Sequence, residues 1–336
     1  MAIENNQLPL NLQEVNKTTG EVVKLDVNSA STVQPVALMR LGLFVPTLKS
    51  TSRSKTNRKN VTDATEELVQ LSIARSEGYN DVKITGSRLD MDTDFKVWLG
   101  IIRSMYDFGV NDDTLKLSFV EFVKMCGFDS RRSNKKMRDR ISNSLFKLAS
   151  VTLKFQSETK GWTTHLVQSA YYDITADVVE IKAEPKLFEL YQMDRRVLLR
   201  LKAIDALQRK ESAQALYTYI ESLPQNPAPI SMKRMRDRLN LTSNLYTQNH
   251  TVRKAMSQLK NIGYLDYTEF KRGRATYFSV HYRNPKLISS KVVVPREPEK
   301  EAPEQDYDEV IKALKAAGID PQKLAKALAS MKPEND

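Results

Sequence analysis

The chain has 336 residues, 40% of them hydrophobic, and carries 52 Lys and Arg against 41 Asp and Glu, a formal net charge of +11. This composition excludes wholesale disorder, and no apolar run reaches the roughly 18 to 20 residues that a membrane-spanning helix needs. The first residues do not have the pattern of a secretory signal, and the chain has a single cysteine, Cys126. Both features predict a cytoplasmic protein, and we expect no membrane partner. The excess of positive charge favours nucleic acid as the partner.

The first 60 residues predict a mostly flexible region. Residues 1–34 are polar and aperiodic, and residues 49–60 form a basic run, rich in Ser and Thr, with nothing to bury. Between these two stretches, residues 35–48 are apolar enough to pack on a neighbouring domain. We therefore expect the folded part of the chain to begin near residue 61, with this apolar patch held against it.

Residues 61–184 predict a first domain. Phe95, Trp98 and Ile102 recur at helical spacing and indicate a helix at 94–108. The further predicted elements are a strand at 114–117, a short helix at 119–125, a longer helix at 133–148 and a β-meander after residue 150. The start of the longer helix is strongly basic, although Asp139 interrupts its outer face.

Residues 212–288 show a clearer version of the same order. A helix from residue 212, a short strand in PAPISM, a helix at 232–239 and a polar turn precede a helix at 248–262, for which Thr247 is available as N-cap. Two alternating runs, YLDYTEF and ATYFSVHY, then predict a β-hairpin with Gly273 in its turn. This order is that of a winged helix. The predicted fold is α+β, with two tandem winged-helix domains of pseudo-symmetric topology joined by a helical segment at 185–211.

Positive charge is concentrated in the second domain, where twelve Lys and Arg stand against three acids between Ser231 and Lys286. Val252 and Met256 hold one face of the helix at 248–262 inward, so its opposite face, which holds no acid, is free to enter a major groove. We expect Arg253 to be the chief reader of bases on that face. The predicted DNA-binding residues are Arg131, Arg132, Lys135, Lys136, Lys233, Arg234, Gln248, Asn249, His250, Thr251, Arg253, Lys254, Ser257, Lys271, Arg272 and Arg274.

Motifs for catalysis and for cofactors are missing from the sequence. It contains no GxxxxGK[ST] or GxGxxG loop, and its three histidines and one cysteine lie too far apart for a zinc finger or an HExxH site. His250 and Arg253 have the HxxR spacing of tyrosine recombinases, with Tyr282 downstream, and Tyr171 with Tyr172 could suggest a nickase. A DNA contact and a strand end explain these residues better. We expect no cofactor, no metal and no enzymatic activity.

The end of the chain predicts an appendage. Residues 289–306 form a linker rich in proline and charge, and residues 307–336 form two short helical patterns separated by Gly318. We expect this helical tail to be a small protein contact.

Several long strings resemble the RepFIB-type RepA plasmid replication initiators, a group of iteron-binding initiators with two winged-helix domains. They include TVQPVALMRLGLFVPTLKS, LFELYQMDRRVLLRLKAIDALQRKESAQALYTYIESLP and QNHTVRKAMSQLKNIGYLDYTEFKRGRATYF, and the resemblance covers approximately residues 33–286. It implies a protein that binds repeated origin sites (iterons) in double-stranded DNA, helps to open adjacent AT-rich DNA, and recruits the host initiator and the replicative helicase.

The resemblance also implies repression of the protein's own promoter by a homodimer, and a place on the plasmid in the bacterial nucleoid. It matches residues 248–262 to the second recognition helix, residues 271–274 to the wing, and residues 131–140 to the start of the helix in the first domain. Two alternatives stay open: a winged-helix transcriptional repressor without initiation activity, and a DNA nickase or recombinase.

Overall fold

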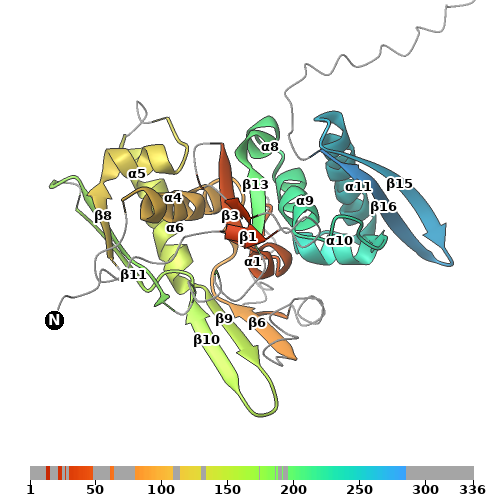
Figure 1. Cartoon of the computed structure of the whole chain (residues 1–336), viewed down its shortest axis with the longest axis horizontal. Coiled ribbons are helices and arrows are strands. Elements are labelled where there is room, and N and C mark those ends of the chain that lie inside the picture. The colour runs from red at the N-terminus through yellow and green to blue at the C-terminus, as the bar shows by residue number, and fades with distance from the viewer. Residues whose placement is uncertain are drawn as a thin grey trace, which may run out of the picture. The chain divides into compact units, whose positions relative to one another are not determined.

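The computed structural model describes residues 13–15, 22–24, 27, 30–47, 61–63, 80–108, 114–129, 134–173, 175–185, 187, 191 and 196–284 (Figure 1). Contacts divide the chain into Met1–Ile288 and Ser289–Asp336, and every described residue belongs to the first of these units. The predicted linker at 289–306 and the predicted tail at 307–336 therefore lie outside the described residues. No helix of the described ranges is long and apolar enough to cross a membrane.

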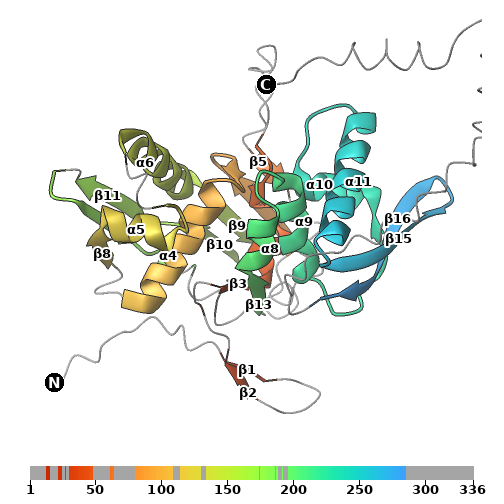
Figure 2. The same cartoon turned by 90° about the horizontal axis from the view of Figure 1, so that it is seen from above.

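The C-terminal half of this unit has the predicted element order. Its elements are α9 (Glu211–Glu221), β14 (Ile230–Ser231), α10 (Met232–Leu239), α11 (Leu245–Asn261), β15 (Leu265–Arg272) and β16 (Ala275–Arg283). The three strands form one sheet in the order β14-β16-β15, and the long hairpin β15–β16 lies beside α11 (Figure 2). The apolar stripe of α11, with Val252, Met256 and Leu259, is buried as predicted.

The start of α11 differs from the prediction by almost one turn. Asn244, not Thr247, is the N-cap: its side-chain oxygen accepts a hydrogen bond of 2.9 Å from the backbone N–H of Thr247. Both residue types cap helices, so the sequence leaves two candidate starts three residues apart. The structure selects the earlier one and adds Leu245 and Tyr246 to the helix.

The N-terminal half of the unit contains the predicted helices α4 (Asp94–Phe108), α5 (Phe119–Met125) and α6 (Lys135–Ser150). The strands around them are β5 (Val61–Asp63), β6 (Asp81–Thr85), β7 (Leu89–Asp90), β8 (Thr114–Ser118), β9 (Thr152–Gln156), β10 (Gly161–His165), β11 (Ser169–Asp173) and β12 (Val178–Lys182). They form separate sheets, β10-β9-β6-β5 and β11-β12-β8. The predicted single meander is therefore wrong. Leu166 and Val167 are buried where the chain leaves the first of these sheets for the second.

Residues 30–47 are part of the fold. Strand β3 (Ser31–Pro35) pairs antiparallel with β13 (Arg196–Arg200), helix α1 (Val36–Arg40) follows, and β4 (Phe44–Val45) pairs in parallel with β7. Two predictions are corrected here: residues 31–34 are a buried strand, not a flexible stretch, and the segment at 185–211 is not helical throughout. Strands β3 and β13 are far apart in the sequence, and their pairing depends on context, so neither segment alone predicts it. The other described elements are β1 (Gln13–Val15), which pairs with β2 (Val22–Lys24), and α8 (Leu201–Ala206).

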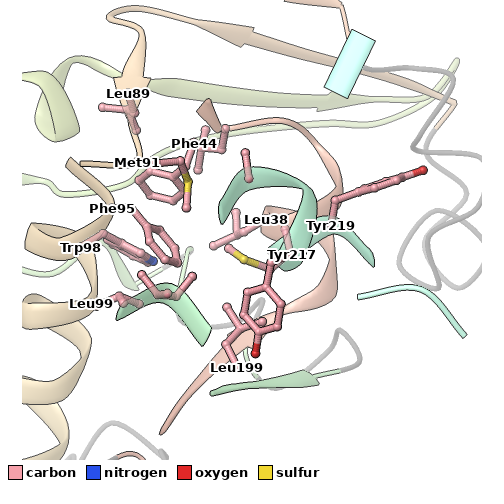
Figure 3. Packing of buried hydrophobic residues seen from close by; sticks show 14 of the residues in the cluster. Leu38, Phe44, Leu89, Met91, Phe95, Trp98, Leu99, Leu199, Tyr217 and Tyr219 are labelled. Carbon is pink, nitrogen blue, oxygen red and sulfur yellow. The ribbon is translucent and has the colours of Figure 1, made fainter. Parts of the chain in front are cut away.

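The apolar patch at 35–48 packs as predicted. Leu38 and Phe44 come together with Phe95 of α4 in the buried cluster of Figure 3, and the rings of Phe44 and Phe95 meet edge to face at 5.0 Å. On the other side, α1 packs on α9. This segment, which we name the N-terminal strap (residues 31–47), thus contacts both halves of the unit.

Candidate nucleic-acid interface

The outward face of α11 is the centre of the candidate interface. His250, Lys254 and Ser257 are exposed opposite the buried stripe, as predicted. One turn earlier, Tyr246 lies on the same side of the helix and is 83% exposed. The sequence prediction missed Tyr246 because it began the helix at residue 248. The N-terminal residues of a recognition helix are the ones that approach base edges, so the added turn enlarges the candidate surface.

Three predicted contact residues of α11 are instead engaged within the protein. The amide of Gln248 donates to the carbonyl oxygens of Leu241 and Ser243, at 3.2 and 2.6 Å. The Asn249 side chain accepts a hydrogen bond of 2.7 Å from Arg236 on α10, and the Thr251 hydroxyl donates to the Thr247 carbonyl at 2.9 Å. The bonds of Gln248 and Asn249 tie the start of α11 to the preceding turn and to α10, whereas the bond of Thr251 lies within α11.

Arg253 is held by an acid from the wing. The Glu269 carboxylate on β15 accepts from Arg253 Nε at 2.9 and 3.1 Å, and its Oε1 lies 2.8 Å from Nη2. The hydrogen bond to Glu269 raises the pKa of the Arg253 guanidinium. The sequence shows that α11 itself has no acid on this face, and it gives no sign that the neighbouring strand supplies one.

The tip of the hairpin β15–β16 is a cluster of cations. Lys271, Arg272 and Arg274 are exposed around Gly273, whose φ of 61° suits the left-handed turn for which glycine is favoured. Among the described residues, none of the three cations has a hydrogen-bond or ion-pair partner. Such cations attract phosphate, and their position matches the predicted wing.

The cations of α10 have partners within the protein. Arg238 is buried and donates to the carbonyls of Met39 and Phe44 in the N-terminal strap, at 3.1 and 3.0 Å. Lys233 lies 3.2 Å from Asp237, and the Arg234 guanidinium lies over the Tyr219 ring at 5.7 Å. The charge count of the sequence therefore overstates the positive charge that is available to DNA.

The predicted DNA-binding cations of the first half lie at the start of α6 and just before it. Lys135 and Lys136 are exposed at the start of α6, which Asn134 caps, whereas Arg131 and Arg132 lie outside the described residues. Two further cations of α6 are engaged: Arg138 lies over the Phe119 ring at 4.6 Å, and Arg140 pairs with Asp92.

The hairpin β11–β12 of the first half is acidic at its tip. Asp173 accepts hydrogen bonds from the backbone N–H groups of Ala176 and Thr175, at 2.9 and 2.8 Å, and these bonds lower the pKa of its carboxyl. Asp177 follows in the same turn. Asp177 pairs with Arg138 of α6 at 3.5 Å. Asp173 has no cation partner among the described residues and repels phosphate, so the tips of the two hairpins differ in the sign of their charge.

An ion-paired cluster lies between α4 and α6. Lys147 Nζ lies 2.7 Å from Asp94 and 3.2 Å from Asp90, beside an open cavity of about 480 Å³. Burial and the neighbouring Asp90 charge raise the pKa of Asp94 to about 6. Lys147 is the cation that contacts both carboxylates, those of Asp90 and Asp94. The cluster therefore ties the start of α4 to α6.

Two of the tyrosines weighed for catalysis, Tyr282 and Tyr171, are exposed on separate hairpins. The single cysteine, Cys126, is buried, which raises the pKa of its thiol. Within the described part of the chain, no group of three His, Cys, Asp or Glu residues is arranged to hold a metal ion.

The chain is similar to known proteins over most of its length. Residues 81–221 match the family described as "Initiator Replication protein, WH1". RepFIB replication protein A of Salmonella typhi is 58% identical over 277 residues, which cover 81% of this chain and 85% of the relative. Replication protein RepA of Salmonella typhi is 55% identical over 303 residues, covering 89% and 86%, and protein RepA of Escherichia coli is 46% identical over 266 residues, covering 78% and 91%.

A crystal structure of domains 2 and 3 of RctB, at 12% identity and a TM-score of 0.44, covers 74% of this chain and 98% of that one. The identity to the RepA relatives extends over most of both chains. The chain belongs to the RepFIB-type RepA family of replication initiator proteins.

Proposed function

We propose that this initiator binds repeated sites in the double-stranded DNA of a plasmid origin, with α11 in the major groove and the tip of β15–β16 on the phosphate backbone. The observation that carries the proposal is the set of unpartnered cations, Lys254 on α11 and Lys271, Arg272 and Arg274 on the wing, on two adjacent elements. A helix such as α11 that enters the major groove can contact the edges of the bases. Cations beside it contact the phosphates, and these contacts add affinity and fix the position of the protein along the DNA.

The two halves are proposed to be pseudo-symmetric winged helices with unequal roles. Their sheets have the related orders β11-β12-β8 and β15-β16-β14, and each sheet includes the strand that follows the half's first helix. The hairpin β9–β10 stands as an insertion in the first half. Because the hairpin tip of the first half is acidic, we assign base reading to the second half and phosphate contacts through Lys135 and Lys136 to the first.

The roles proposed for the later steps of initiation are those that the resemblance to the family implies. We propose that the bound protein helps to open adjacent AT-rich DNA, recruits the host initiator and the replicative helicase, and represses its own promoter as a homodimer. The tail at 307–336 is the proposed protein contact. No step of this scheme requires the protein to cut DNA, so Tyr282→Phe and Tyr171→Phe are expected to bind and fire the origin normally. A covalent protein–DNA adduct that either substitution abolishes would favour the nickase alternative.

The wing provides the test of DNA binding. The triple variant Lys271→Ala, Arg272→Ala, Arg274→Ala is expected to weaken binding to origin and random DNA alike. Three lost phosphate contacts reduce the slope of log K against log salt by about 2.7, at about 0.9 for each contact. Titrations at several salt concentrations measure this slope, and an unchanged slope at full affinity would remove the wing from the proposal.

Initiation is tested separately from binding. A plasmid that carries only this origin is introduced into a host with no other way to replicate it, and promoter repression is measured in parallel with a reporter. We expect the wild-type chain to maintain the plasmid. Repression without plasmid maintenance would support the alternative of a repressor that does not initiate.

A further inference from the structure

The contact between Arg253 and Glu269 leaves one edge of the guanidinium free. A guanidinium has five N–H donors: one on Nε and two on each terminal nitrogen. The Glu269 carboxylate takes the edge formed by Nε and Nη2, with all three distances between 2.8 and 3.1 Å. In the described part of the structure, no hydrogen bond reaches Nη1. The end of the fork, formed by Nη1 and Nη2, is therefore available to a ligand.

The free edge has the geometry of a guanine reader. Two parallel N–H donors at the end of an arginine match the O6 and N7 acceptors that guanine presents in the major groove. A flexible arginine loses rotamer entropy when it makes this contact, and a side chain that is already held loses less. The Arg253 side chain is 47% exposed, so the acid holds the arginine without covering it.

The sheet register explains why Glu269 faces α11. Glu269 lies directly opposite Phe278, which is buried, and Tyr267, two residues earlier on the same face, packs on the Phe278 ring at 5.8 Å. Phe270 points to the other face, where it stacks on Tyr277. Glu269 is therefore on the face of β15 that packs on α11, at the point where this face leaves the core and becomes exposed.

We propose that Glu269 is a specificity-determining residue that acts through Arg253: it holds the guanidinium by one edge so that the other edge reads a guanine. The inference rests on the proposed function, since it assigns the partner of an α11 side chain within the same interface. It also gives Glu269 a second effect, because a paired Arg253 is a weaker attractant for phosphate than a free one. Glu269 therefore raises specificity while lowering affinity for random DNA.

Substitution of Glu269 has an unusual expected signature. In Glu269→Gln, Arg253 is released to follow phosphates, so random DNA binds more tightly and its salt slope steepens by up to about 0.9. Discrimination at one base pair of the origin repeat falls by about fivefold or more, the lower end of what a bidentate contact contributes. Glu269→Asp keeps the charge but shortens the reach, so it is expected to lose discrimination without gaining affinity for random DNA.

The chain provides a matched control on the same two elements. Asp266 of β15 pairs with Lys260 of α11 at 2.7 Å, and both side chains are more than half exposed, at 58% and 56%. Asp266→Asn changes the net charge by the same amount as Glu269→Gln, but it frees an ammonium near the end of the helix. We expect Asp266→Asn to keep the wild-type discrimination.

The experiment is a competition titration of the full chain against the origin repeat and its single-base variants, with each protein first shown to be folded by thermal melting. In an Arg253→Ala background, Glu269→Gln is expected to cause no further loss of discrimination, because its effect passes through Arg253. Wild-type discrimination in Glu269→Gln, or an equal loss in both backgrounds, would overturn the inference. A wild-type chain with no preference for origin over random DNA would instead refute the proposed function.

Discussion

Arg238→Met is expected to destabilise the protein without removing a DNA contact. The buried guanidinium donates to two carbonyls of the N-terminal strap, those of Met39 and Phe44, and its Nη2 lies 3.3 Å from the Thr218 hydroxyl. A hydrogen bond to a charged group contributes about 1.5–3 kcal/mol, so the two carbonyl bonds contribute about 3–6 kcal/mol. Removal of a buried charge returns part of this stability, because the guanidinium no longer has to be desolvated. We expect a net loss of about 3 kcal/mol.

The assay is thermal or urea unfolding of the full chain. A loss of about 3 kcal/mol corresponds to a decrease of Tm by about 6–12 °C in a domain of this size. The matched control is Arg236→Met on the same helix, where a half-buried side chain gives up one bond to Asn249, so we expect a loss of about 1 kcal/mol or less. Equal stability of the two variants, or a salt slope of DNA binding that falls by about 0.9 in Arg238→Met, would refute the assignment.

Three further predictions concern other parts of the molecule. Tyr246→Ala removes an exposed aromatic ring from the start of α11 and is expected to weaken origin binding several-fold with unchanged thermal stability, as titration and melting would show. Lys135→Ala with Lys136→Ala is expected to reduce the salt slope by about 1.8 and to leave base discrimination unchanged in single-base competition. Lys147→Met is expected to cost about 2 kcal/mol at neutral pH, less than a fully buried pair because Lys147 is 34% exposed, and urea unfolding at several pH values measures it.

The pH dependence of Lys147→Met has a defined sign. Burial raises the pKa of Asp94 to about 6, above its ordinary value of 3.8, so the folded protein holds a proton that the unfolded chain releases between these values. The contribution of Asp94 to the free energy of unfolding is fully present below pH 3.8, the unfolded pKa, and is lost as pH rises through the folded pKa of about 6. Without Lys147 the folded pKa rises further, so the deficit of the variant is expected to shrink between pH 8 and pH 5. A deficit that grows over this range would contradict the reasoning.

Local sequence patterns predicted the helices of both halves, but not strands β5, β6 and β7 or how distant strands pair. The helices at 94–108, 119–125 and 232–239 have the predicted bounds, because each has a clear apolar periodicity. The pairing of β3 with β13 and the change of sheet at Leu166 and Val167 depend on contacts between segments far apart in the chain. Such contacts are decided by packing, which a local pattern does not record.

The candidate site was predicted from the positions of positive charges. The structure shows which of the described cations have partners within the protein and which do not. Arg238 was one of the twelve cations counted between Ser231 and Lys286, although its spacing of three residues from the buried Met235 already indicated the inner face of α10. The role of Glu269 depends on register: it faces α11 because Phe278 opposite it is buried. Composition cannot distinguish a cation held by a carboxylate from one that is free for a phosphate.

Methylation interference on the origin tests the central claim, that α11 reads bases in the major groove, most directly. Methylation of guanine N7 blocks the acceptor to which an arginine fork donates. We predict at least one guanine in each repeat whose methylation prevents binding of the wild-type chain, and whose effect disappears in folded Arg253→Ala. An interference pattern that is identical in the two proteins would contradict the assignment of base reading to Arg253.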